Sequence, residues 1–154
     1  MPTRYKGSPD EVLALDTIIK LIRSLNSVQA RLTPQLQKDF GVTESQFGVM
    51  DALLHLGPLS QGQICEKILR SGSNVTTVVD NLERDGLVTR VRDEADRRVQ
   101  IVQLTAKGRS LILEAFPAHV TRVTALMSAL SADEQRELGR ICRKLGEGRA
   151  VERV

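Results

Sequence analysis

Apolar residues recur at intervals of three and four along most of the chain, a spacing that predicts a mainly helical protein. The longest stripe lies within residues 8–40 and consists of Val12, Leu15, Ile18, Ile19, Ile22, Leu25, Val28 and Leu32. Further helices are expected over 43–56, 61–70, 74–84, 105–130 and 131–146. Between 87 and 104 the pattern changes to two β-rich runs, LVTRVR and VQIVQL, which predict a hairpin.

Local signals mark where several of these helices begin. A serine or threonine followed three residues later by Glu or Gln forms a capping box, and this pattern starts at Ser8, Thr43, Ser60 and Ser131. Pro34 is expected to kink or restart the first helix, because proline has no amide hydrogen to donate. The break at Gly57-Pro58-Leu59 leaves room for a very short strand.

The stretch from Ser71 to Leu104 joins a short helix directly to a hairpin whose tip reads DEADRR. The preceding short helix and a turn containing Gly72 complete a helix-turn-helix pattern. In such a unit the second helix fits the DNA major groove, and the hairpin can reach the minor groove or the phosphates. The predicted fold class is therefore mainly α with a small β-hairpin (α+β), a winged helix-turn-helix.

Outward positions on the second helix and arginines in the hairpin supply candidate DNA contacts. Asn and Thr side chains are short enough to reach base edges or phosphates, and arginine suits the negative potential of the minor groove. The candidates are Asn74, Thr76, Thr77, Asn81, Arg84, Arg92, Arg97 and Arg98. Asp80, Glu83 and Asp85 are unfavourable beside phosphate, so we expect them to point away from DNA or to hold nearby arginines.

Composition narrows the function classes. Of the 154 residues only 3% are aromatic and none is Trp, which argues against base-stacking or sugar-binding platforms. The net charge of +3 is mild, so the placement of arginines matters more than the total. No signal peptide or run of membrane-spanning length is found in the sequence, and a cytoplasmic protein without membrane contact is expected.

Signals for catalysis, metals and cofactors are missing from the sequence. It carries no nucleotide-binding glycine loop, no GxSxG and no HExxH, so no enzyme and no cofactor is expected. His55 and His119 have no Cys, Asp or Glu at ligand spacing, and no metal site is expected. Cys65 and Cys142 form no CxxC pair, and both are predicted to be buried structural thiols.

The predicted domain organisation is one compact domain with two functional regions. Residues 43–104 form the winged helix-turn-helix, and residues 8–40 and 105–146 form a helical dimerisation region. Long terminal helices with apolar stripes and no further chain to cover them suggest a homodimer. Two recognition helices could then meet a pseudo-palindromic site about one helical turn, or roughly 34 Å, apart.

The run VVDNLERDGLVTRVRDEADRRVQIVQLTAKG resembles the multiple antibiotic resistance regulator (MarR) family. The matching pieces are LERDGLV, the wing DEADRR and the exit LTAKG, and the order of helices over residues 8–146 also agrees. The resemblance implies a homodimeric winged-helix repressor, less often an activator, that binds palindromic double-stranded DNA. It also implies release of the DNA by a small, often phenolic, ligand or by thiol oxidation.

Single residues carry over from this resemblance. Arg98 is similar to the wing arginine that enters the minor groove, with Arg97 as a second contact, and Asp96 to the acid that holds the wing in shape. The start of the recognition helix is matched by Ser73, Asn74, Thr76 and Thr77. The oxidation-sensing branch carries a reactive cysteine near the start of the first helix, and this chain has none there.

Other interpretations stay open at this point. The hairpin arginines could belong to a solvated turn in which Asp93, Glu94 and Asp96 pair with them. The winged helix could serve as a protein-interaction module without DNA binding, or the chain could be a thiol-based redox-responsive regulator. The effector-binding residues are unknown, although His55 could face a small-molecule pocket between the DNA-binding region and the dimerisation helices.

Overall fold

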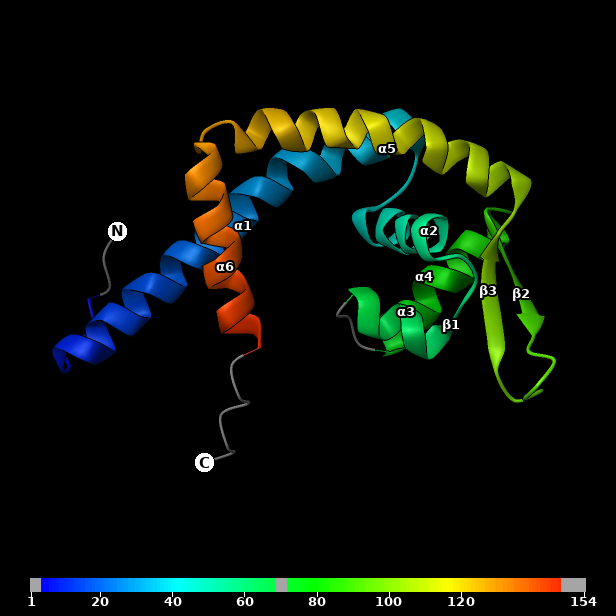
Figure 1. Cartoon of the computed structure of the whole chain (residues 1–154), viewed down its shortest axis with the longest axis horizontal. Coiled ribbons are helices and arrows are strands. Elements are labelled where there is room, and N and C mark those ends of the chain that lie inside the picture. Colours follow the sequence, from blue (N-terminus) through cyan, green and yellow to red (C-terminus); the bar gives the residue numbers. More distant parts are fainter. Residues whose placement is uncertain (1–3, 69–71, 148–154) are drawn as a thin grey trace. The chain divides into compact units, whose positions relative to one another are not determined.

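The computed structural model describes residues 4–68 and 72–147, with the backbone alone for residues 72–74. Its elements, in chain order, are α1 (Pro9–Phe40), α2 (Glu44–Leu56), β1 (Leu59–Ser60), α3 (Gln61–Ile68), α4 (Gly72–Arg84), β2 (Val88–Arg92), β3 (Gln100–Leu104), α5 (Ala106–Met127) and α6 (Ala132–Gly146) (Figure 1). The predicted class, mainly α with a small β element, is confirmed. The predicted turn residue Ser71 lies outside the described residues.

The predicted capping boxes all form. At Ser8, Thr43 and Ser131 the side-chain oxygen accepts from the amide three residues on, and that residue's side chain accepts from the cap's own amide. Ser60 and Gln63 exchange the same two bonds at the start of α3, at 3.3 and 2.8 Å. These bonds satisfy amides that a helix start otherwise leaves unpaired, so local sequence determines where these helices begin.

The first helix does not restart at proline. α1 continues through Pro34 to Phe40 and ends at Gly41, whose φ of 69° is the left-handed conformation common after helices. The expectation of a restart was therefore wrong. Pro34 removes one helical hydrogen bond, but Leu36, on the following turn, is 1% exposed within the core. Burial of the Leu36 side chain favours continuation of the helix past the proline.

The sheet is a wing of three antiparallel strands in the order β1-β3-β2. Val88 pairs with Leu104 and Arg92 with Gln100, so β2 and β3 form the predicted hairpin. The short strand β1 adds to the other edge of β3, where Leu59 pairs with Val102. Both of these side chains face the core, since Leu59 is 7% exposed and Val102 is fully buried.

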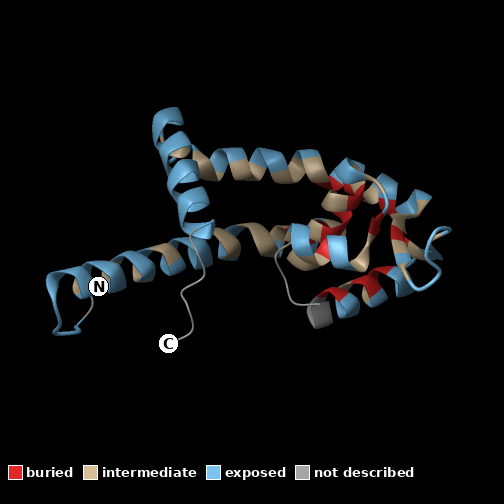
Figure 2. Ribbon diagram, turned by 60° about the horizontal axis from the view of Figure 1, so that its bottom comes forward, coloured by how far each residue is buried: buried red, intermediate tan, exposed pale blue. Residues whose placement is uncertain are grey.

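The chain divides into two compact units, with the boundary between His119 and Val120 inside α5. The buried apolar side chains all lie in the first unit, between Leu36 and Ala115, and Figure 2 draws them in red on α2, α3, α4, the sheet and the start of α5. In the second unit no residue from 120 to 147 is buried. Among the described helices, none combines the length and apolar character that a membrane span requires.

Candidate nucleic-acid interface

The helix α4 is strongly amphipathic and is held in the first unit by its apolar side. Val75, Val79 and Leu82 are fully buried. The opposite side exposes Thr76 and Thr77 to solvent. α4 therefore has the form expected of a recognition helix, with one side anchored and a polar side left accessible.

A side-chain bond joins α4 to the helix before it. The side-chain amide of Gln61, the first residue of α3, donates a hydrogen bond to the hydroxyl of Thr76. This contact connects the two helices at their accessible side, close to the positions that would approach DNA. Sequence reasoning did not identify Gln61, because the bond spans fifteen residues and only the crossing of the two helices brings it about.

The loop between β2 and β3 is shaped by two aspartates. The carboxylate of Asp93 accepts from the amides of Ala95 and Asp96 at 2.7 and 3.0 Å. The carboxylate of Asp96 accepts from the amide of Arg98 at 2.9 Å. Aspartate commonly organises turns by bonding to nearby amides in this way. The loop thereby presents Arg97 and Arg98 as exposed side chains, and Asp93 is a contributor that the sequence analysis overlooked.

The acids of α4 are held by Arg90 of β2. One guanidinium nitrogen lies 2.5 Å from Asp80 Oδ1 and the other 2.5 Å from Glu83 Oε2, with the Arg90 side chain only 15% exposed. Burial alone would lower the pKa of Arg90, but the hydrogen bonds and charges of the two carboxylates raise it above its ordinary value. The expectation that these acids hold arginines is confirmed, and the pairing links the wing to α4.

The end of α4 is clamped to the start of α5. Gly86, at a φ of 72°, turns the chain so that its carbonyl accepts from the Thr105 hydroxyl at 2.7 Å. Lys107 Nζ donates to the carbonyl of Asp85 at 2.8 Å. A Cβ on Gly108 would lie 1.9 Å from the Leu87 carbonyl oxygen, so only glycine allows this approach. The segments DGL and LTAKG of the family resemblance are thus contact partners.

Arg98 also lies beside the start of α3. A hollow of about 460 Å³ is lined by Ser60, Gln61, Gly62, Arg98, Val99 and Gln100. Since Gln61 bonds to Thr76 of α4, the hollow connects the wing arginine with both helices of the helix-turn-helix. Three segments that are far apart in the sequence therefore contribute to one accessible surface of the first unit.

The residues predicted to contact DNA differ in how far their side chains are exposed. Asn81 is partly buried, and the side chains of Ser73 and Asn74 lie outside what the structure describes. Arg84 bonds to Asp85, with Nε 3.3 Å from Oδ1, and remains 71% exposed. The predicted residues that are exposed are Thr76, Thr77, Arg84, Arg92, Asp96, Arg97 and Arg98.

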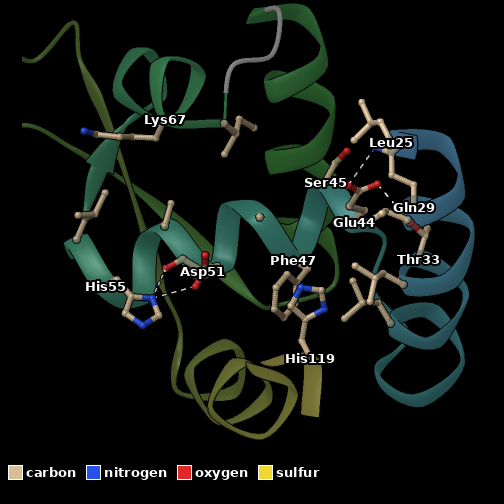
Figure 3. Close-up of a pocket in the computed structure, with 17 residues that line it drawn as sticks. Leu25, Gln29, Thr33, Glu44, Ser45, Phe47, Asp51, His55, Lys67 and His119 are labelled. Carbon is tan, nitrogen blue, oxygen red and sulfur yellow. Dashed lines mark hydrogen bonds and ion pairs between the residues drawn. The ribbon is translucent and has the colours of Figure 1, made fainter. Parts of the chain in front are cut away.

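The first unit also contains a cavity of about 630 Å³, away from the wing (Figure 3). Its apolar wall includes Phe47, whose ring centroid lies 4.6 Å from that of His119. Its polar lining includes Glu44, Asp51 and His55, so the sequence-based suggestion that His55 faces a pocket agrees with its position. The remaining lining residues are Leu25, Val28, Gln29, Leu32, Thr33, Leu36, Ser45, Gly48, Ala52, Leu56, Lys67 and Ile68.

The predicted burial is wrong for Cys142, which is exposed on α6. Cys65 of α3 is partly buried and packs against the core. The apolar stripe of α6 places Cys142 on its apolar side, but none of the residues of α6 is buried. Over residues 4–68 and 72–147, no three His, Cys, Asp or Glu residues are arranged to hold a metal ion.

A helix-turn-helix followed by an arginine-tipped three-stranded wing defines a winged helix DNA-binding protein. The sequence profile of the MarR family matches residues 40–99. The transcriptional regulator MhqR of Bacillus subtilis is 32% identical over 133 residues, which cover 86% of this chain and 91% of that protein. The chain belongs to the MarR family, as the resemblance implied. It is a DNA-binding transcriptional regulator and not an enzyme.

Solved structures agree with this assignment. Sco3205 of Streptomyces coelicolor, a MarR family regulator in complex with DNA, superposes with a TM-score of 0.82 at 25% identity, covering 95% of this chain and 91% of that one. BpsR of Bordetella bronchiseptica, whose DNA binding is regulated by 6-hydroxynicotinic acid, has a TM-score of 0.71 at 25% identity and covers 83% of this chain and 99% of that one.

Proposed function

We propose that this chain is a homodimeric repressor that acts in the cytoplasm on a pseudo-palindromic operator and is released by a small-molecule ligand. The observation that carries the DNA contact is the arginine pair of the wing. Arg97 and Arg98 are exposed and lie on a loop that the carboxylates of Asp93 and Asp96 organise. A loop whose backbone is already ordered loses less conformational entropy when its arginines enter the minor groove.

The polar side of α4 supports major-groove binding. Thr76 and Thr77 are exposed there, and the carboxylates of Asp80 and Glu83 are paired with Arg90. The pairing reduces the repulsion that these acids would otherwise exert on phosphate. The recognition helix can therefore approach the DNA backbone although its sequence carries two acids on that side.

Exposed apolar residues on the terminal helices support a homodimer. Leu15, Ile18 and Ile22 of α1 are 38–50% exposed, and Leu138, Ile141 and Leu145 of α6 are 41–62% exposed. Large side chains exposed in such stripes are typical of interaction surfaces. A second copy of the chain is the partner that gives two recognition helices for two half-sites.

The cavity supports control by a ligand. Its volume of about 630 Å³ falls within the range of roughly 300–1,000 Å³ that is usual for small-molecule sites. It lies in the same unit as the helix-turn-helix, and helix α2 contributes both to its lining and to the core beneath α4. A ligand there could change the packing of α2 and with it the position of the recognition helix.

The operator contact is tested with Arg98→Ala. Operator DNA is first selected from a random pool, and binding is then followed by fluorescence anisotropy over a series of salt concentrations. We expect the affinity to fall by about 1–3 kcal/mol and the salt slope to drop by about one counterion. Thermal unfolding should change little, because the Arg98 side chain is exposed.

The matched control is Arg136→Ala, which removes the same charge from the polar surface of α6, where Arg136 is 72% exposed and pairs with Asp133. This variant should keep the operator affinity of the unmodified chain. Equal losses of operator affinity in the two variants would mean that the effect of Arg98→Ala comes from the change in net charge alone. Unchanged operator affinity in Arg98→Ala would mean that this side chain of the wing does not contact the DNA.

A further inference from the structure

We infer that the cavity selects ring-bearing ligands that donate hydrogen bonds and carry no negative charge, and that Glu44 and Asp51 set this selectivity. The inference rests on the proposed function, because it takes the cavity to be the effector site. It adds the chemistry of the ligand, which the lining residues of this particular chain define.

The apolar part of the cavity suits a flat ring. Leu25, Val28 and Leu32 of α1 line it together with Phe47 of α2. The rings of Phe47 and His119, both lining residues, are tilted by 48° with centroids 4.6 Å apart, and Figure 3 draws them next to each other. Aromatic and aliphatic walls of this kind bind planar apolar molecules by burying their faces.

Glu44 brings a negative charge that neutral groups hold in place. It is the first residue of α2, and a negative charge there lies next to the positive end of the helix dipole. Its two oxygens accept from the side-chain amide of Gln29 at 3.4 Å and from the Thr33 hydroxyl at 3.3 Å. Both donors are uncharged, so the negative charge is not cancelled. A carboxylate has about four acceptor positions, so Glu44 can still accept from a ligand.

Asp51 is the second carboxylate of the lining. Its Oδ1 is shielded from solvent and lies 2.9 Å from Nδ1 of His55. The same nitrogen lies 3.1 Å from the Asp51 carbonyl oxygen. This nitrogen can carry at most one N–H for the two oxygens, and Asp51 Oδ1 has no hydrogen bond of its own among the described residues. A donor on a ligand would satisfy it better, because a shielded acceptor gains most from a full hydrogen bond.

Within residues 4–68 and 72–147, no permanent cation is paired with Glu44 or Asp51. Of the described residues that line the cavity, Lys67 is the one with a permanent positive charge, and it forms an ion pair with neither carboxylate. Figure 3 draws its ammonium group apart from Glu44 and Asp51. An organic anion entering the cavity would lose its hydration and meet like charge. A hydroxyl or an ammonium group would instead donate to the carboxylates.

The test compares ligands that share one ring system. Isothermal titration calorimetry of the full chain uses 2-naphthol, 2-naphthylmethylamine, 2-naphthoate and 2-methoxynaphthalene at neutral pH. We expect the first two to bind and 2-naphthoate to bind about tenfold or more weakly. The methoxy compound, which accepts but cannot donate, should also bind more weakly than 2-naphthol. The alcohol and the amine together tell whether a neutral or a cationic donor is preferred.

Two variants assign the selectivity to its residues. Glu44→Gln and Asp51→Asn remove the charges with little change of shape, and each should reduce the ratio between the affinities for 2-naphthol and 2-naphthoate. The matched control Glu114→Gln removes the same charge from an exposed position on α5 that does not line the cavity. It should leave the ratio unchanged. The comparison of ligands on the unmodified chain stands even if a variant folds poorly.

The possible results distinguish the proposed ligand selectivity from the proposal that the cavity binds a ligand at all. If 2-naphthoate binds as tightly as 2-naphthol, the selectivity is wrong while the cavity remains a ligand site. If none of the four compounds binds, both the cavity as effector site and its selectivity are overturned. Neither result affects DNA binding, which the operator experiment with Arg98→Ala tests by itself.

Discussion

The two units of the chain differ in whether the apolar side of an amphipathic helix is buried or exposed. In the first unit Val75, Val79 and Leu82 of α4 are fully buried. In the second unit α6 has an equally regular apolar stripe, yet Leu138, Ile141 and Leu145 are 41%, 47% and 62% exposed. Figure 2 makes the contrast visible, with red residues on α4 and none on α6. The sequence pattern is of the same kind in both helices.

The difference lies in what covers each helix. α4 packs against α2, α3 and β2 of its own unit, so its apolar side forms part of one core with α2 and the sheet. α6 buries no residue at all. An amphipathic pattern thus indicates that one side of a helix will be buried, but it does not indicate which element or chain buries it. The apolar side of α4 is buried by other elements of the same chain, and we propose that a second copy of the chain buries that of α6.

The largest effect is expected from Leu82→Ala, because the Leu82 side chain is fully buried. The variant should lower the free energy of unfolding by about 2–5 kcal/mol, the usual result of deleting core methyl groups and leaving a cavity. Urea denaturation followed by circular dichroism measures this loss.

The comparison variant is Leu145→Ala, whose side chain is 62% exposed. Its cost should be smaller and should depend on protein concentration, because it acts through association of two chains. The cost of Leu82→Ala should not depend on concentration in this way. Equal, concentration-independent losses in both variants would mean that α6 is covered within its own chain.

The next effect in size is expected from Ile141→Asp on the apolar stripe of α6. A carboxylate buried without a partner in a dimer interface costs several kcal/mol, so sedimentation should shift from dimer to monomer. Arg143→Asp serves as the control, because two residues of spacing place it on the other side of the helix. If both variants sediment as the unmodified chain does, the stripe is not the dimer contact.

A smaller effect is expected from Arg90→Gln, which removes the link between the wing and α4. Unfolding should become easier by about 1–2 kcal/mol, between the values for exposed and buried ion pairs. Operator affinity should also fall, because Asp80 and Glu83 are left unpaired near phosphate. Adding Asp80→Asn to this variant should restore part of the affinity. Absence of any recovery would show that Arg90 acts through the fold alone.

The smallest effect concerns the pH dependence of α6. Hydrogen bonds from the Ser131 amide and hydroxyl lower the pKa of Glu134. The capping box therefore contributes stability above the ordinary pKa of glutamate, and this contribution is lost as the pH falls through the lowered value. Carboxyl titration by NMR should find the lowered pKa, and Ser131→Ala should raise it part of the way. An ordinary pKa in the unmodified chain would mean that the box does not form in solution.

Much of the candidate site could be read from residue types and local order. Thr76, Thr77, Arg97 and Arg98 are exposed as expected, and the acids of α4 do hold an arginine. The contributions of Gln61 and Asp93 were not foreseen. Gln61 acts through the crossing of two helices, and Asp93 through the particular path of a loop, and neither geometry is encoded by hydrophobic spacing.

The thiols show the limit of the helical pattern most clearly. Cys142 lies on the apolar stripe of α6, which predicted burial, and it is exposed. The cavity was equally out of reach, since its carboxylates Glu44 and Asp51 belong to α2 and their neighbours Gln29 and Thr33 to α1. Which residues line a cavity depends on how helices meet.

The sequence by itself determined the elements of this protein and its membership of a class. These elements depend on residues that are close together in the sequence, as in the capping boxes, the helical spacing and the two β-rich runs. They can therefore be recognised without a structure. Tertiary structure alone decided the pairing of Arg90 with Asp80 and Glu83, the contact of Gly108 with Leu87, and which apolar stripe is buried. These depend on contacts between distant segments, whose energies follow from packing geometry and not from local order.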